Sequence, residues 1–181
     1  MSRIAVPTHE TAPAASQPLL DAVKKQLGVV PNSFRLVALS PAALQGLLGL
    51  SGALAKALDL KTRERIALAI AQSNGCDYCL SAHTYIGLNL AKIDVAEIAL
   101  NRKGASAEPK ANAAVAFAVK VNEARGKVSD ADLQAVTDAG YTDAQIVEII
   151  AVVAENIFTN FINIVAGTEI DFPVVVAAEA A

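Results

Sequence analysis

Apolar residues recur at intervals of three and four along most of this chain, which is the spacing of one face of an α-helix. The spacing is clear at Leu19, Leu20, Val23 and Leu27, after which Gly28 ends the predicted helix. No segment alternates between apolar and polar residues for long, as a strand would. The pattern therefore predicts an all-α protein with helices over residues 16–27, 34–39, 41–58, 61–73, 76–90, 94–101, 108–125, 129–139 and 142–165.

The predicted helices belong to one domain that covers residues 1–181, because neither a linker nor an internal repeat divides the chain. Residues 66–71 are apolar on every side of their helix, which predicts a helix that is buried all round. Two segments show no helical pattern. They are the N-terminal segment 1–15, which is rich in Ala, Pro and Thr, and the C-terminal segment 168–181 as far as its final alanines. We expect both segments to be loose tails, with an arm over a neighbouring subunit as the alternative for residues 1–15.

The composition predicts a protein that associates with copies of itself. Hydrophobic residues make up 54% of the chain and charged residues only 18%, against a usual charged share of about 25%. Polar groups this scarce cannot cover the surface of a small domain, so we expect helix faces to be buried between subunits. The net charge of −3, without a cluster of Lys and Arg, argues against nucleic acid as a partner.

One uncharged segment, residues 36–55, is long enough to raise the question of a membrane span. Ser40 and Pro41 interrupt it and Gln45 lies within it, so a buried or interface helix is the better interpretation, and we predict no membrane association. The start of the chain lacks the pattern of a signal peptide. We therefore expect a cytoplasmic protein, in which a cysteine pair is more often redox-active or metal-binding than a structural disulfide.

Both cysteines of the chain and one of its two histidines form the sequence Cys76-x-x-Cys79-x-x-x-His83. On a helix these three residues fall at i, i+3 and i+7 and share one face. Gly75 frees the backbone to turn, which would place both cysteines in the first turn of the next helix. There the pKa of a thiol falls from about 8.5 to roughly 3.5–7.5, and Cα atoms about 5 Å apart allow a disulfide.

The position of His83 predicts different roles for the two thiols. It lies one helical turn from Cys79, where imidazole and sulfur can meet, and two turns, roughly 10 Å, from Cys76. We therefore predict that His83 is the base for Cys79, that Cys79 is the nucleophile and that Cys76 is the resolving thiol.

Glu64 is the predicted fourth member of this site. Its helical neighbours Ala67 and Leu68 are apolar, so burial should raise the pKa of its carboxyl group. The short turn at residues 73–75 would make the two helices an antiparallel pair. Glu64 is then expected to exchange protons with His83, directly or through a water.

The four predicted site residues fill a spacing of E-x11-C-x2-C-x3-H, beginning at Glu64. This spacing resembles the signature of the alkylhydroperoxidase D branch of the carboxymuconolactone decarboxylase family, with a cysteine-containing core at about residues 40–100. The closing T-E-I-D-F-P, residues 168–173, further resembles a peroxidase-related subgroup. The resemblance implies a compact multi-helix domain with the C-x-x-C at the N-terminus of a buried helix.

The resemblance also implies an activity, that of a thiol-dependent peroxidase with an antioxidant role. Cys79, deprotonated through a relay from Glu64 through a water to His83, would attack a hydroperoxide, and Cys76 would close the disulfide. An external dithiol, a dihydrolipoyl group in the founding members, would reduce it, so no bound cofactor is expected. The assembly would be a trimer or a hexamer. The decarboxylase branch lacks the cysteine pair, so decarboxylase activity is not implied.

One position departs from the family pattern. Founding members carry a second histidine between the cysteines, where this chain has Tyr78. A phenol with a pKa near 10 donates a hydrogen bond but is a poor base at neutral pH. Tyr78 is expected at the mouth of the site, with packing as the alternative.

Other interpretations of these residues remain open. A zinc site would need Glu64 or His9 as a fourth ligand, whereas structural zinc prefers a closed Cys/His set, so we predict no metal. A general dithiol–disulfide oxidoreductase and a non-catalytic oligomeric redox sensor or binding protein also fit the cysteine pair. Finally, Asn156, Asn160 and Asn163 form a polar stripe on an apolar helix, which we assign to subunit contacts rather than to the pocket.

Overall fold

In the computed structural model, which describes residues 2–177, the chain is all-helical and has no strand within that range. The helices are α1 (Gln17–Leu27), α2 (Asn32–Val37), α3 (Pro41–Ala57), α4 (Leu60–Ser73), α5 (Asp77–Asn89), α6 (Val95–Arg102), α7 (Pro109–Glu123), α8 (Asp130–Asp138) and α9 (Asp143–Ala166). The predicted fold class is confirmed, and each helix lies within a few residues of its expected range.

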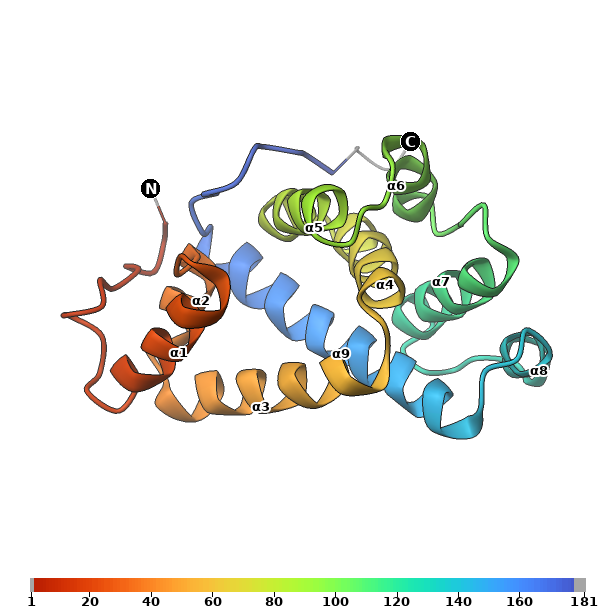
Figure 1. The fold of residues 1–181 in the computed structure, drawn as a ribbon, viewed down its shortest axis with the longest axis horizontal. Coiled ribbons are helices and arrows are strands. Elements are labelled where there is room, and N and C mark those ends of the chain that lie inside the picture. Colours follow the sequence, from red (N-terminus) through yellow and green to blue (C-terminus); the bar gives the residue numbers. More distant parts are fainter. Residues whose placement is uncertain (1, 178–181) are drawn as a thin grey trace.

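Helix α4 forms the centre of the core. Its residues from Ile66 to Ala71 are all at most 2% exposed, which confirms the predicted all-round burial. It packs against α5, α6, α7 and α9, so that one helix contributes to the two neighbouring hydrophobic clusters. Figure 1 shows α9 crossing the middle of the molecule, with α1 and α2 near one end and α7 and α8 near the other. The cysteine helix α5 is thereby held between α4, α6 and α9.

The uncharged segment 36–55 is divided between two helices. Helix α2 ends at Val37, and the side chain of Ser40 caps α3 by accepting a hydrogen bond from the Ala43 amide at 3.3 Å. By length and composition α9 alone among the described helices could cross a membrane. It instead packs on α3, α4, α5 and α7 as a core helix of the domain.

The expectation of loose tails is wrong for the part of the C-terminal tail that the structure describes. Residues 168–177, which we call the C-terminal strap, contain no helix but run over α5, as Figure 1 shows. The Val175 amide donates to Ser81 Oγ at 2.9 Å, and the Ala177 amide donates to Asp77 Oδ1 at 2.8 Å. Non-helical backbone can therefore be firmly held when side chains of a neighbouring helix satisfy it. Residues 178–181 lie outside the described part of the chain.

The N-terminal tail is also packed rather than loose. The Arg3 amide donates to the Ala166 carbonyl at 2.6 Å, which joins the tail to the end of α9. Ala12 is buried in the cluster formed by α1, α2 and α3. Contacts between parts far apart in the sequence, which local patterns do not reveal, fix both tails.

The assignment of the asparagine stripe to subunit contacts is wrong as well. Asn156, Asn160 and Asn163 are at most 5% exposed within this single chain. Asn160 Oδ1 accepts a hydrogen bond from Asn74, and Asn163 donates one to Ser33 Oγ. Amide side chains fit an apolar environment only where they find such partners, and here α2 and the α4–α5 turn supply them.

Candidate active site

A tight turn brings the predicted site residues together. Helix α4 ends at Ser73, Asn74 follows as its C-cap, and Gly75 adopts a φ of 69°, which favours glycine. The chain therefore reverses at once into α5, and the two helices pack closely along their length. The predicted antiparallel pair is present.

The two cysteines form a disulfide at the start of α5. Their Cα atoms are 5.3 Å apart, close to the expected separation. Cys76 is the N-cap residue, one position earlier than predicted, and its sulfur accepts a hydrogen bond from the Cys79 amide at 3.2 Å. Both side chains are buried, with 1% and 3% exposure. Amide donors and the helix dipole at this end favour negative charge on sulfur in the reduced state.

Glu64 and His83 are in direct contact on the facing sides of α4 and α5. Glu64 Oε2 lies 2.8 Å from His83 Nδ1, without an intervening water, and the glutamate side chain is only 8% exposed. Burial lowers the pKa of His83, but the charge of Glu64 and the hydrogen bond to its carboxylate raise it by more, so the net pKa is raised. His83 is thus a stronger base than an ordinary histidine, one helical turn from Cys79.

A second carboxyl group near His83 was not predicted from the sequence. Burial raises the pKa of Glu155 on α9, opposed by a hydrogen bond that Ser51 on α3 donates to it. Its negative charge adds to that of Glu64 in raising the pKa of His83. A signal was present, because Glu155 is the last charged residue of α9, and only apolar, Asn and Thr residues follow it along that helix.

Tyr78 does not take the position of a base. Its hydroxyl donates to Asp171 Oδ1 at 2.8 Å and accepts from the Ser33 amide at 3.0 Å. Burial and the neighbouring Asp171 raise its pKa, against the opposing hydrogen bond from Ser33. The ring is 5% exposed and meets Phe172 edge to face, at 5.9 Å between centroids. Tyr78 is therefore an anchor for the C-terminal strap, and packing, rather than the mouth of the site, describes its environment.

The strap closes the cysteine site from one side. Ile170, Phe172, Val175 and Ala177 pack against the hydrophobic cluster that contains both sulfurs. Asp171 also accepts a hydrogen bond from the Asn32 amide at 2.8 Å, so the strap is tied to α2 as well as to α5. The strap is therefore one of the elements that bury the disulfide.

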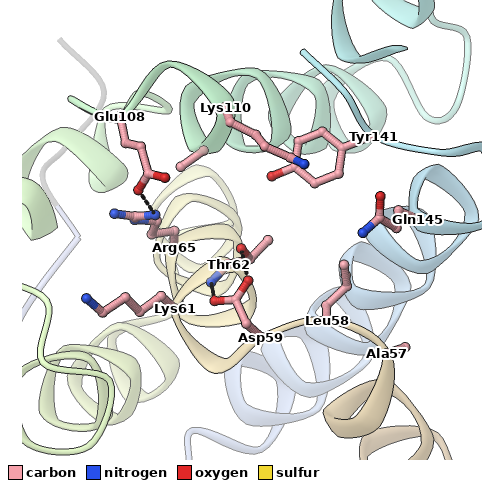
Figure 2. Close-up of a pocket in the computed structure, with 11 residues that line it drawn as sticks. Ala57, Leu58, Asp59, Lys61, Thr62, Arg65, Glu108, Lys110, Tyr141 and Gln145 are labelled. Atoms are coloured by element: carbon pink, nitrogen blue, oxygen red, sulfur yellow. Dashed lines mark hydrogen bonds and ion pairs between the residues drawn. The ribbon is translucent and has the colours of Figure 1, made fainter. Parts of the chain in front are cut away.

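A cavity of about 620 Å³ at the start of α4 is a separate feature, because it is lined by none of the four predicted site residues. Figure 2 shows that polar groups around it pair with one another, Arg65 with Glu108 and Asp59 with Thr62. Lys110 Nζ donates to the Gly140 carbonyl at 3.1 Å. Its lining residues are Ala57, Leu58, Asp59, Lys61, Thr62, Arg65, Glu108, Lys110, Ala111, Tyr141 and Gln145.

Metal binding finds no support in the described residues, where no group of three or more His, Cys, Asp or Glu side chains is arranged to hold an ion. His9 was considered above as a fourth ligand, and its Nε2 lies 3.0 Å from Asp21 Oδ1 of α1.

Comparison with known proteins agrees with the resemblance described from the sequence. The model of the carboxymuconolactone decarboxylase family matches residues 41–120. The crystal structure of a peroxidase-related protein with an alkylhydroperoxidase AhpD core, from Ralstonia eutropha JMP134, is 28% identical, with a TM-score of 0.82 over 94% of this chain and 92% of that one. Among curated proteins, no sequence matches this chain significantly.

Two further solved structures share the fold at lower identity. A peroxidase-related protein from Silicibacter sp. TM1040 is 22% identical, with a TM-score of 0.79 over 93% of this chain and 91% of that one. The debrominase Bmp8 is 19% identical, with a TM-score of 0.75 over 94% of this chain and 91% of that one. At these identities the likeness concerns the fold alone.

The fold and the site together define an all-helical protein with a buried C-x-x-C disulfide beside a Glu–His pair. The chain is similar to the carboxymuconolactone decarboxylase family over residues 41–120 and, over 94% of its length, to a peroxidase-related protein with an alkylhydroperoxidase AhpD core, in line with the resemblance that the spacing of the four site residues indicated.

Proposed function

We propose that this protein is an alkylhydroperoxidase-type peroxidase that reduces hydroperoxides with the Cys76–Cys79 dithiol. One observation carries the proposal: a buried disulfide begins α5, and the Glu64–His83 pair lies one helical turn further along. A raised pKa at His83 favours transfer of the Cys79 proton to the imidazole, and Glu64 stabilises the resulting imidazolium. The site thus supports a nucleophilic thiolate at neutral pH.

The proposed cycle has two chemical steps. The Cys79 thiolate attacks the terminal oxygen of the hydroperoxide, the O–O bond breaks, and the departing alkoxide takes the proton held by His83. Cys79 is then a sulfenic acid and the peroxide has become an alcohol. The Cys76 thiol next attacks the Cys79 sulfur, which forms the disulfide and releases water. Two thiols are oxidised for each hydroperoxide reduced.

The burial of the disulfide supports a slender dithiol as the reductant. Cys76 and Cys79 are 1% and 3% exposed, so a flat protein surface would not reach either sulfur. A dihydrolipoyl group on a flexible arm has the required shape and supplies both electrons by thiol–disulfide exchange. No cofactor bound to this chain is needed for that cycle.

General dithiol–disulfide exchange is the second candidate function. It is supported by Tyr78, whose hydroxyl is engaged by Asp171 and Ser33 and supplies no second base for peroxide chemistry. Burial of the sulfurs would then restrict the exchange to small disulfides. Faster reduction of a small disulfide than of any hydroperoxide would favour this alternative.

We also propose that the protein is a cytoplasmic homo-oligomer, a trimer or a hexamer. The support is an outward apolar face on α9, in which Val147, Phe161 and Val165 are 55–65% exposed. Phe158, which is 40% exposed, Phe161 and Val165 follow one another at spacings of three and four residues, which is typical of a helix face that packs against a partner.

The test is trapping of the sulfenic acid. In Cys76→Ser, one equivalent of an organic hydroperoxide should oxidise Cys79 to a sulfenic acid that dimedone labels, as seen by mass spectrometry. The unsubstituted protein should instead lose both thiols to one intramolecular disulfide. Survival of both thiols in the unsubstituted protein would overturn the proposal. Sulfenic acid that forms faster on Cys76 in Cys79→Ser than on Cys79 in Cys76→Ser would reverse the roles of the cysteines.

A further inference from the structure

Asn163, in the last turns of α9, lies directly against the cysteine site. It is 3% exposed, and its Nδ2 is 3.5 Å from Cys79 Sγ. The same nitrogen donates one hydrogen to the Thr159 carbonyl at 2.9 Å, and its other hydrogen is shared between Ser33 Oγ at 3.0 Å and the Cys79 sulfur. A backbone carbonyl only accepts hydrogen bonds, so the contact with Thr159 fixes which side of the amide is the nitrogen. The donor side of Asn163 therefore faces the sulfur.

The acceptor side of the same amide is unusual. Asn163 Oδ1 is buried and has no hydrogen-bond partner among the described residues. Most buried carbonyl oxygens are paired, so an unpaired one next to a reactive sulfur is an acceptor open to an O–H group of a substrate. A hydroperoxide carries such an O–H group.

The other asparagines of the stripe do not share this arrangement. Asn156 donates to the Val152 carbonyl of its own helix at 2.9 Å, and Asn160 accepts from Asn74. Of the three, only Asn163 contacts a sulfur of the disulfide. The feature is thus a property of one position rather than of the stripe.

We propose that Asn163 is a catalytic residue, with Nδ2 donating to the Cys79 sulfur and Oδ1 accepting from the O–H group of the hydroperoxide. This inference rests on the proposed peroxidase function and names the residue that binds the reacting group. One planar amide would hold both reactants, so the oxygen to be transferred lies beside the nucleophile.

The role of Asn163 fits the chemistry of the step. The hydrogen bond from Nδ2 stabilises the thiolate before attack. Oδ1 holds the terminal O–H, which is the oxygen that forms the new S–O bond while the O–O bond breaks. The alkoxide that leaves takes its proton from His83, on the other side of Cys79 along α5. Asn163 neither gains nor loses a proton overall.

The test compares Asn163→Ala with Asn156→Ala, both in the Cys76→Ser background. Asn156 is a matched control because it lies on the same face of α9, is similarly buried and bonds only to its own helix among the contacts above. Two rate constants are measured at pH 7: alkylation of Cys79 by iodoacetamide, which reports the thiolate, and oxidation of Cys79 by cumene hydroperoxide. Circular dichroism establishes that each variant is folded.

Asn163→Ala should slow alkylation severalfold and oxidation by about 100-fold, since a lost transition-state donor typically costs 10²–10³. Asn156→Ala should change neither rate by more than about twofold. If Asn163→Ala proves unfolded, Asn163→Asp keeps the shape and the acceptor while removing the donor, and should slow alkylation at least as much.

Three results would overturn the inference, and they differ. If Asn163→Ala is oxidised as fast as Asn156→Ala, Asn163 has no catalytic role while the peroxidase function stands. If the Cys76→Ser parent itself is alkylated but never oxidised by the hydroperoxide, the proposed function fails and the peroxide-binding role fails with it. If Asn163→Ala slows alkylation and oxidation of Cys79 by the same factor, Oδ1 has no role of its own, and binding of the hydroperoxide by Asn163 is refuted.

Discussion

Replacement of Tyr78 by Phe should open the cover over the disulfide. The substitution removes one hydroxyl, which donates to Asp171 Oδ1 and accepts from the Ser33 amide. The ring remains to pack on Phe172, so the change concerns the attachment of the C-terminal strap rather than the core.

The size of the effect follows from these two hydrogen bonds. A bond to a charged acceptor contributes about 1.5–3 kcal/mol and a neutral one about 1 kcal/mol. Asp171 keeps its bond from the Asn32 amide, and water can satisfy part of what is lost, which leaves a net loss of about 2 kcal/mol. Local opening of the strap should therefore be about 30-fold more populated.

Two assays report that opening. Native-state hydrogen exchange should be faster by about the same factor at the amides of Val175 and Ala177, which the strap donates to α5. Reduction of the buried disulfide by dithiothreitol should be faster by up to about 30-fold, because both sulfurs are covered in the closed state.

Tyr85→Phe is the matched control. Tyr85 is also on α5 and its ring is also 5.9 Å from that of Phe172, but it is 43% exposed. The Tyr85→Phe substitution should leave hydrogen exchange of the strap amides and reduction of the disulfide unchanged. Tyr78→Phe could lower the melting temperature and yet leave hydrogen exchange of the strap amides and reduction of the disulfide unchanged. That result would show that the strap does not control access to the disulfide and would refute this prediction.

Two further outcomes test one charged group in the site and one on α6. Glu64→Gln should lower the pKa of His83, because burial of the imidazole remains and the negative charge of Glu64, which raises that pKa, is lost. Nuclear magnetic resonance titration measures the pKa of His83, with His9 as an internal reference. An unchanged pKa would contradict the pairing of His83 with Glu64. Burial alone would raise the pKa of Glu97, but three hydrogen bonds and the charge of Arg65 lower it below 4.5. The ionised Glu97 side chain therefore stabilises the folded protein above pH 4.5, and this stabilisation is lost as the pH falls through the lowered pKa. Glu97→Gln should thus destabilise the protein by about 3 kcal/mol at pH 7 in urea unfolding and by progressively less as the pH falls through the lowered pKa of Glu97. An equal loss at every pH down to acid unfolding would exclude the charge as the cause.

Local patterns in the sequence were sufficient for most of the fold. Helical spacing of apolar residues and the glycines after helices depend on contacts within a few residues, so they can be read from the sequence alone. The apolar stretch from Ile66 to Ala71 predicted the central helix for the same reason. The C-x-x-C spacing and Gly75 likewise place the disulfide at the start of α5, because all of these residues belong to one turn and one helix.

Only the tertiary structure decided what surrounds that disulfide. Asn163 is 84 residues from Cys79, and Asp171 is 93 residues from Tyr78, so no local pattern links them. The asparagine stripe was assigned to subunit contacts because a polar stripe on an apolar helix has the same sequence whether its partners lie in another subunit or in the same chain.

The sequence by itself thus determined the helices, the thiol pair and the Glu64–His83 partnership across a short turn. The tertiary structure decided the cover over the sulfurs, the anchoring role of Tyr78 and the amide that faces Cys79. The physical reason is that helix formation and capping depend on neighbours in the chain, whereas burial and the pairing of polar side chains depend on which helices and loops the folded chain brings together.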